Sequence, residues 1–377
     1  MSPPLLTLSF LATVVLRSRV PLLVLPLAFT FVFAAPADPR LQELLKRYPA
    51  ADTNKDGVLS FEEAQAHAKV IRRGAKSAGP EGDEGIAPRT SKAQKPAPTH
   101  ADVSYGPHER HKLDLWLAQA ERPTPLVVYI HGGGFVNGSK AGASADMIKG
   151  CLDRGVSFMA INYRFRTSAP IQDILRDCAR SIQFVRAKAK DYNLDPARIA
   201  SYGGSAGAGT SLWLAFHPDL ADPSATDPVL RQSSRIVAAG AINTQATYNV
   251  QLWPDFLGKP NSEWSRPGET AAFYGAKSDA ELDAMKTVLA DVDMLGLISR
   301  DDPPVFMFSS QPDGELANRG HYLHHPNHAR TVQKACAAAG VPATVWFAMT
   351  EPRIAGDYQT KLREFLFQHL TAMPAAK

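Results

Sequence analysis

The chain has 377 residues, of which 45% are hydrophobic and 21% are charged, a balance typical of a globular protein. The formal net charge is +4, with 41 Lys and Arg against 37 Asp and Glu, so the charge gives no reason to expect a nucleic-acid partner. No segment repeats at a spacing of about 20–50 residues, which argues against a solenoid or a propeller.

The first 37 residues have the parts of an export signal. Arg17 and Arg19 precede an apolar run, VPLLVLPLAFTFVFAA (20–35), which ends in small residues. The run is short and contains two prolines, which argues against a stable membrane-spanning helix. We therefore predict a signal peptide over residues 1–37 and a secreted or periplasmic protein, with membrane attachment only if the signal is not cleaved.

Residues 38–73 contain a calcium-binding pattern. The stretch DTNKDGVLSFEE (52–63) matches D-x-[DN]-x-[DN]-G-x5-E without a mismatch. Oxygen ligands at this spacing wrap one Ca²⁺, and Gly57 permits the sharp turn. The predicted ligands are Asp52, Asn54, Asp56, Val58 through its carbonyl, Ser60 and Glu63. The stretch resembles an EF-hand. Because EF-hands usually occur in pairs, either a partner chain supplies a second one or this loop binds calcium alone and weakly.

Residues 74–100 are rich in Gly, Pro, Ser and charge, a composition that predicts a flexible linker. From 101 to 377, helical stretches alternate with short, apolar, β-rich runs: PLVVYIHG, SFMAINYR, RIASYGGS, VAAGAINT, PPVFMFSS and ATVWFAMT. This alternation predicts an α/β domain with a mostly parallel sheet flanked by helices, preceded by the small helical calcium-binding segment. Two runs near its start, ADVSYG and HKLDLWLA, predict an antiparallel hairpin that leads into the sheet.

Residues 245–300 interrupt the alternation and include Trp253, Trp264 and Phe273. We interpret this segment as an insertion that either shapes a substrate pocket or forms a packed excursion from the sheet. The three cysteines, Cys151, Cys178 and Cys336, lie in helical stretches and have no metal-site spacing, so we expect buried free thiols.

The stretch SYGGSAGAG (201–209) follows a predicted strand and begins a predicted helix. Within it, Gly203, Ser205 and Gly207 fit the pattern G-x-S-x-G. A strand that turns abruptly into a helix strains the serine backbone and requires tiny residues two positions before and after it. Such a turn would expose the Ser205 hydroxyl at a helix N-terminus as a nucleophile.

A second glycine-rich stretch, VVYIHGGGF (127–135), ends another predicted strand. Residues without side chains let backbone N–H groups approach a tetrahedral oxyanion. We predict that the N–H groups of Gly133, Gly134 and Ala206 form the oxyanion hole. His131 in this position is expected to brace the loop rather than to act as a base.

Together, HGGG and G-x-S-x-G resemble the α/β-hydrolase fold, and within it the esterases similar to hormone-sensitive lipase. The resemblance covers about 101–377. It implies a Ser–Asp–His triad in that chain order and ester hydrolysis through an acyl-enzyme, without a cofactor for catalysis. It also implies that the acid follows the next-to-last strand, where PPVFMFSSQPDGE places Asp313, with Glu315 as the second choice.

The base departs from the family pattern. The loop after the last strand, AMTEPRIAGDYQTK (348–361), has no histidine, and Glu351 stands close to the expected position. Instead, four histidines follow Asp313 in GHYLHHPNHAR (320–330): His321, His324, His325 and His328. Either His324 or His325 could serve as the base. The two alternatives are a transition-metal site and structural loop histidines.

The sequence thus predicts an exported serine hydrolase that cleaves a small ester, carbohydrate-linked by family analogy, with a calcium-binding appendage. The rival hypothesis is a non-catalytic binding or scaffold protein whose hydrolase domain has lost its histidine.

Overall fold

The computed structural model describes residues 45–46, 49–53, 55–57, 94–264, 267–348 and 357–371. The chain divides into two compact units, Met1–Asp83 and Glu84–Lys377. The predicted signal peptide, much of the predicted calcium loop and most of the predicted linker lie outside the described residues. In the described part of the chain, no helix has the length and apolar character needed to span a membrane.

The second unit is built on an eight-stranded sheet with strand order β1-β2-β4-β3-β5-β6-β7-β8. Strands β1 and β2 form an antiparallel hairpin, β2 is antiparallel to β4, and all other neighbours are parallel. The strands are His100–Ser104, Lys112–Trp116, Thr124–Ile130, Ser157–Ile161, Leu194–Gly204, Ala239–Ile242, Val305–Ser309 and Ala343–Phe347 for β1 to β8. The predicted α/β fold and its leading hairpin are confirmed.

This unit extends into the segment predicted to be linker. His100 is already the first residue of β1, and the Trp116 indole donates a hydrogen bond of 2.8 Å to the carbonyl of Pro96. The end of 74–100 therefore belongs to the α/β unit.

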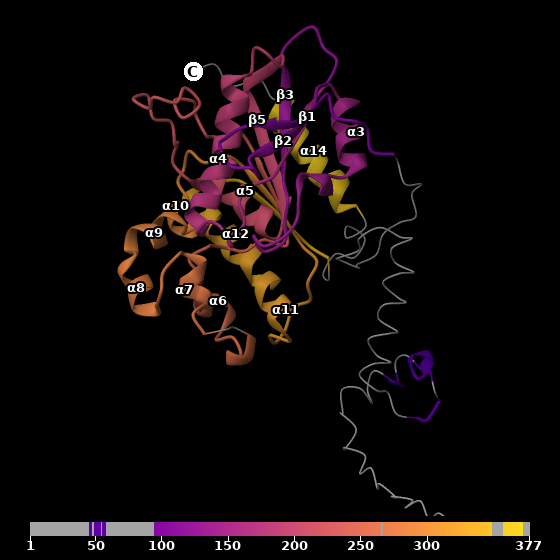
Figure 1. Ribbon diagram of the computed structural model, residues 1–377, viewed down its shortest axis with the longest axis vertical. Helices are drawn as coiled ribbons and strands as arrows, with labels where there is room; N and C mark the ends of the chain where they lie inside the picture. The colour runs from indigo at the N-terminus through magenta and orange to yellow at the C-terminus, as the bar shows by residue number, and fades with distance from the viewer. Residues whose placement is uncertain are drawn as a thin grey trace, which may run out of the picture. The chain divides into compact units, whose positions relative to one another are not determined.

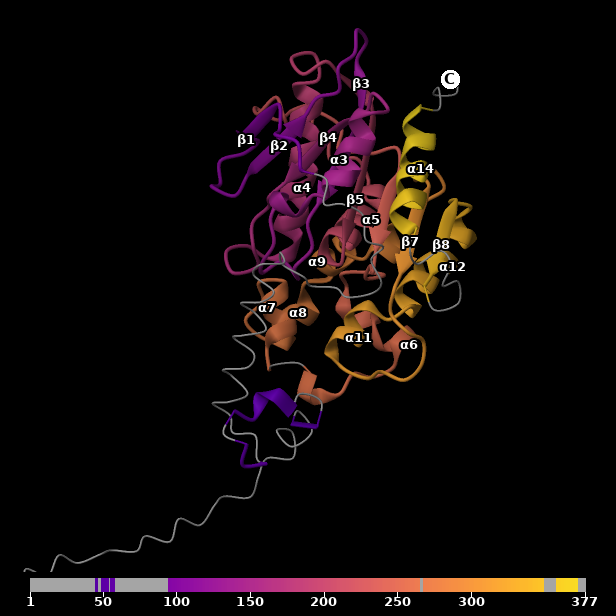
Figure 2. The ribbon, with the colours of Figure 1, turned by 90° about the vertical axis from the view of Figure 1, so that its right-hand side faces the viewer.

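Helices cover both faces of the sheet (Figures 1 and 2). On one face lie α3 (Ala145–Leu152) and α14 (Tyr358–Thr371), which pack with Val127 and Phe158. On the other face lie α4 (Ile171–Ala187), α5 (Ala206–Phe216) and α12 (Asn327–Ala339). Alternate residues of β3 join the two apolar clusters, as expected for a strand buried on both sides. All three cysteines are buried free thiols on these helices, and burial raises the pKa of Cys151 and of Cys336 to about 12.

The insertion between β6 and β7 is helical. Its α-helices are α6 (Pro254–Leu257), α7 (Glu269–Phe273), α8 (Asp279–Ala284), α9 (Lys286–Asp291) and α10 (Met294–Leu297), with 3-10 turns at Val250–Leu252 and Ser262–Trp264. Both ribbon views place α6, α7 and α8 near α11 (Arg319–His324), beyond one end of the sheet (Figures 1 and 2). Trp253, Trp264 and Phe273 all line a cavity there, so the insertion shapes a pocket.

Candidate active site

Ser205 lies on a sharp turn between β5 and α5. Its backbone has φ 52° and ψ −118°, a left-handed value of φ that costs a non-glycine residue free energy. A Cβ atom on Gly203 or on Gly207 would overlap the carbonyl of Ile130 in the neighbouring strand. The predicted elbow is therefore present, and the two glycines are required by close backbone approach.

His324 contacts Ser205, the predicted nucleophile. Its Nε2 lies 2.8 Å from Ser205 Oγ, although 119 residues separate them in the chain. Its Nδ1 lies 3.1 Å from the carbonyl oxygen of Gly320, which can only accept a hydrogen bond. Nδ1 therefore carries the proton, and Nε2 is left to accept the hydrogen of the serine hydroxyl.

The other three histidines hold the same segment in place through backbone groups. The Nε2–H of each ring donates to a carbonyl: His321 to Pro312, His325 to Gly314 and His328 to Tyr322. The Nδ1 of each ring accepts a backbone N–H, from Ala317, Asn327 and Ala246 respectively. Both nitrogens of these rings are thus in use, and they offer no lone pair to a metal ion.

Burial keeps two of these rings neutral. It lowers the pKa of the completely buried His328 to about 3, with the nearby His324 and His325 acting in the same direction. It also lowers the pKa of His325, where the hydrogen bond to Gly314 opposes the shift.

Residues at the start of the insertion hold helix α11, which ends at His324, and the first turn of α12. The Gln245 side-chain amide donates to the Leu323 carbonyl at 2.8 Å, and the Ala246 N–H donates to His328 Nδ1 at 3.1 Å. No sequence motif pointed to Gln245, whose hydrogen bond holds the turn of helix that ends at His324.

Asp313 forms a two-pronged ion pair with Arg330. Its oxygens accept hydrogen bonds from both terminal nitrogens of the guanidinium, Nη1 to Oδ1 and Nη2 to Oδ2, the latter at 2.8 Å. These hydrogen bonds lower the pKa of the Asp313 carboxyl and raise the pKa of Arg330, so Asp313 is ionised. The assignments of Asp313, and of Glu315 as second choice, to the triad acid stay predictions.

Two of the three predicted oxyanion donors border the cavity beside Ser205. Gly134 and Ala206 both line it, and Gly133 precedes Gly134 in the same loop with a left-handed φ of 103°. His131 stacks on Tyr163 with ring centroids 4.1 Å apart and donates through Nδ1 to the Gly132 carbonyl at 2.8 Å. Burial lowers the pKa of His131 to about 4, as expected for a neutral residue that braces the loop.

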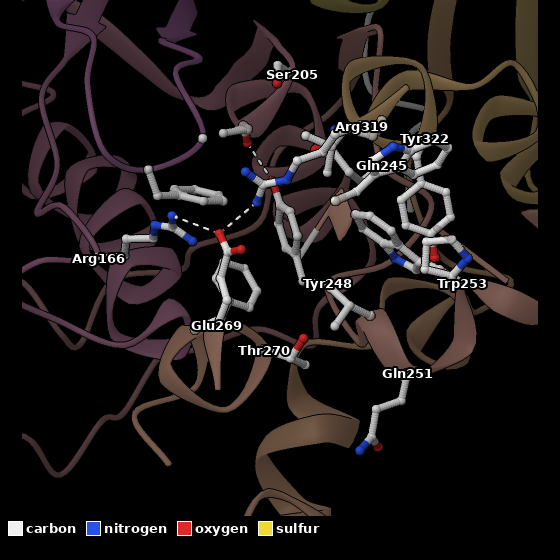
Figure 3. A pocket seen from close by; sticks show the side chains of 18 of the residues that line it. Arg166, Ser205, Gln245, Tyr248, Gln251, Trp253, Glu269, Thr270, Arg319 and Tyr322 are labelled. Carbon is white, nitrogen blue, oxygen red and sulfur yellow. Dashed lines mark hydrogen bonds and ion pairs between the residues drawn. The ribbon is translucent and has the colours of Figure 1, made fainter. Parts of the chain in front are cut away.

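The cavity has a volume of about 450 Å³. Its apolar wall comes largely from aromatic rings of the insertion and α11, including Tyr248, Trp253, Trp264, Phe273 and Tyr322 (Figure 3). The buried Tyr248 hydroxyl donates to the Ala206 carbonyl at 2.5 Å and so ties the insertion to the first residue after the nucleophile. Three charged side chains, Arg166, Glu269 and Arg319, also border the cavity.

The described residues of the calcium pattern adopt a tight turn. Asp52 Oδ2 accepts the Gly57 N–H at 2.9 Å, and Gly57 has a φ of +80°. Asp52 Oδ1 is buried and has no hydrogen-bond partner among the described residues. Of the predicted ligands, Asn54, Val58, Ser60 and Glu63 lie outside the described residues.

The parallel sheet with its antiparallel leading hairpin, the strained serine elbow and the opposed histidine define a protein of the α/β-hydrolase class. The BD-FAE family model matches residues 113–320, more than half of the chain, and the chain belongs to that family.

Curated relatives match about a third of the chain. A probable isoprenylcysteine alpha-carbonyl methylesterase, ICMEL1 of Arabidopsis thaliana, is 31% identical over 137 residues, 36% of this chain and 29% of the relative. A probable carboxylic ester hydrolase, LipM of Mycobacterium tuberculosis, is 32% identical over 146 residues, 37% of this chain and 32% of the relative. The matched part thus spans less than a third of either relative.

Solved structures agree in fold. A truncated carbohydrate esterase from gut microbiota superposes with a TM-score of 0.57 at 20% identity, covering 75% of this chain and all of the other. Esterase Est2 of the Planctomycetes species Thermogutta terrifontis superposes with a TM-score of 0.53 at 21% identity, covering 76% of this chain and 98% of the other.

Proposed function

We propose that the protein is a serine esterase that hydrolyses small carboxylic esters through an acyl-enzyme on Ser205, with His324 as the general base. The observation that carries the proposal is the 2.8 Å contact between Ser205 Oγ and His324 Nε2. Membership of the BD-FAE family and the esterase names of the curated relatives support it.

The proposed reaction has two halves. His324 Nε2 takes the hydroxyl proton while Ser205 Oγ attacks the ester carbonyl, and the resulting oxyanion accepts hydrogen bonds from backbone N–H groups at Gly133, Gly134 and Ala206. The protonated His324 then gives its proton to the departing alcohol. Water, deprotonated by the same ring, attacks the acyl-enzyme, and the ring returns this proton to Ser205 Oγ as the acid is released. The Gly320 carbonyl accepts the Nδ1–H hydrogen bond and favours the tautomer that this sequence of steps requires.

The aromatic wall of the cavity suits an acyl or alcohol group with an apolar face. A carbohydrate-linked ester is the extension we propose from the predicted export and from similarity to esterases. A relative named chlorogenic acid esterase, from Aspergillus niger, is 33% identical over 113 residues, 26% of this chain and 22% of the relative, which supports trying aromatic esters.

The scaffold hypothesis rested on the absence of a histidine from residues 348–361. His324 offers a ring nitrogen to the nucleophile from a different loop. The absence of a histidine after the last strand therefore no longer favours a non-catalytic domain. An esterase also accounts for the strained backbone of Ser205, which a scaffold protein would not need.

Turnover of 4-nitrophenyl acetate by wild type, Ser205→Ala, His324→Ala and His325→Ala tests this proposal. We expect Ser205→Ala and His324→Ala each to lower kcat by at least about 10³-fold, because nucleophile and base act as a unit. His325→Ala should lose far less, since the hydrogen bonds of its ring go to the backbone groups of Gly314 and Asn327 and not to Ser205. A His325 variant as inactive as the His324 variant would refute the base assignment, and equal turnover by all four proteins would refute the enzyme.

We also propose that residues 52–63 bind one Ca²⁺. The turn from Asp52 to Gly57 supports this. Asp52 Oδ1, which is buried and has no hydrogen-bond partner within the described part of the chain, is an oxygen that a cation would satisfy. With Asn54, Asp56, Val58, Ser60 and Glu63 it would supply an all-oxygen set, which suits a hard cation.

Calorimetric titration of the full chain with Ca²⁺ tests this site. Wild type and Lys55→Gln, which alters a non-ligand position, are expected to bind one ion alike, whereas Glu63→Gln should bind at least about tenfold more weakly. Equal affinity of Glu63→Gln and wild type would contradict the ligand set.

A further inference from the structure

The three charged side chains of the cavity form one cluster. Arg166 comes from the loop after β4, Glu269 is the first residue of α7 and Arg319 is the first residue of α11. Glu269 Oε1 lies 3.3 Å from Arg166 Nη2 and 2.6 Å from Arg319 Nη2, so one carboxylate oxygen meets both guanidinium groups (Figure 3).

This cluster carries one more positive than negative charge. Among the described residues that line the cavity, Arg166, Glu269 and Arg319 are the charged ones. Each guanidinium has five N–H groups, and the contacts to Glu269 use one nitrogen of each. Nitrogens therefore remain on both arginines for a second carboxylate, the group that guanidinium binds best with two parallel hydrogen bonds.

Both arginines belong to the segments that form the proposed reaction site. The backbone N–H of Arg166 donates to the carbonyl of Phe135 at 2.8 Å, directly after the oxyanion residue Gly134. Arg319 begins the short helix that ends with His324. An anion bound between them would lie in the same cavity as Ser205.

We propose that Arg166 and Arg319 form an anion subsite that selects esters carrying a carboxylate in their acid or alcohol part. Glu269 holds the two guanidinium groups in place and weakens the subsite through its own negative charge. This inference rests on the proposed esterase function and names the class of substrate that the same site prefers.

Matched esters that differ only in a carboxylate or a carboxamide test the subsite. For the acid part, the pair is the 4-nitrophenyl esters of 4-carboxybenzoate and of 4-carbamoylbenzoate. For the alcohol part, the pair is 4-acetoxybenzoate and 4-acetoxybenzamide. The quantity compared is kcat/KM for the carboxylate divided by kcat/KM for the carboxamide. Intrinsic reactivity of the esters cancels when this ratio is compared between wild type and variants.

In at least one pair, we expect Arg166→Gln and Arg319→Gln to lower this ratio by about tenfold or more, the usual effect of losing a hydrogen bond to a charged group. Glu269→Gln should raise the ratio, because a competing negative charge is removed. The matched control is Arg176→Gln, which alters a half-exposed arginine paired with Asp291 away from the cavity, and should leave the ratio as in wild type.

A ratio unchanged in both arginine variants, or lowered by Glu269→Gln, would overturn the subsite. If the arginine variants do not fold, the salt dependence of KM in wild type tests the subsite instead. Raising NaCl from 0.05 to 0.5 M should increase KM for the preferred carboxylate ester more than for its carboxamide, and equal increases would overturn the subsite. If wild type hydrolyses none of the four esters and does not hydrolyse 4-nitrophenyl acetate, the proposed function itself would be overturned.

Discussion

His324 differs from the three histidines around it in what its ring touches. His321, His325 and His328 each use both nitrogens on backbone groups. His324 directs one nitrogen, Nε2, to the side-chain hydroxyl of Ser205. Histidines thus have two roles in this segment. The local hydrogen bonds determine which ring has a nitrogen that can accept the proton of Ser205.

The acid of the proposed triad, predicted to be Asp313, can be tested by substitution. If Asp313 orients His324, Asp313→Asn should lower kcat by about 10²–10⁴ with a small change in KM. Arg330→Gln, which removes the ion pair together with the contacts of Arg330 to Asn327 and Phe347, should cost far less. Steady-state kinetics on both variants and on Glu351→Gln measure this difference.

Equal, modest losses in Asp313→Asn and Arg330→Gln would show that Asp313 acts through its ion pair alone. A large loss confined to Glu351→Gln would transfer the role of the acid to the residue that stands, in sequence, close to where the family has its histidine.

The elbow between β5 and α5 allows a prediction at the scale of one element. Gly207→Ala would press a methyl group against the Ile130 carbonyl and push Ser205 out of position, so we expect at least about a hundredfold loss of kcat/KM in the folded protein. Gly204→Ala is the matched control, because a Cβ there meets nothing within 4 Å. Activity of Gly207→Ala close to that of Gly204→Ala would contradict the packing argument.

Elements governed by short-range patterns were predictable. The strands, the hairpin and the elbow follow from apolar runs and glycine spacing within about ten residues. The choice of His324 could not be predicted. It depends on where the six-residue helix α11 ends and on long-range hydrogen bonds, from Gln245 to Leu323 of α11 and from Ala246 to His328 of α12. The grouping of Arg166, Glu269 and Arg319 was invisible for the same reason: three distant segments supply it.

At the scale of the whole molecule, composition and alternation predicted the α/β unit but placed its start too late. Pro96 and His100 lie in a stretch whose composition predicted a linker, yet both contact β2. Contacts of this kind come from tertiary packing and leave no local pattern. The export signal over 1–37 stays a prediction.

Buried neutral histidines make the stability of the whole domain depend on pH. The pKa values of His131 and His328 are lowered to about 4 and about 3 in the folded protein, while an unfolded histidine titrates near 6.5. Between these values the unfolded chain binds more protons than the folded one, so stability present at neutral pH is lost as the pH falls below about 6.5.

Linkage then gives the size of the effect. From pH 7 to pH 5.5, each of these two histidines should lower the free energy of unfolding by about 1 kcal/mol, or about 2 kcal/mol together. Urea unfolding at the two pH values measures the difference. His328→Gln should be less stable overall but should lose about 1 kcal/mol less than wild type over this interval, because one titrating group is gone. An equal loss in both proteins would mean that protonation of His328 is not coupled to unfolding.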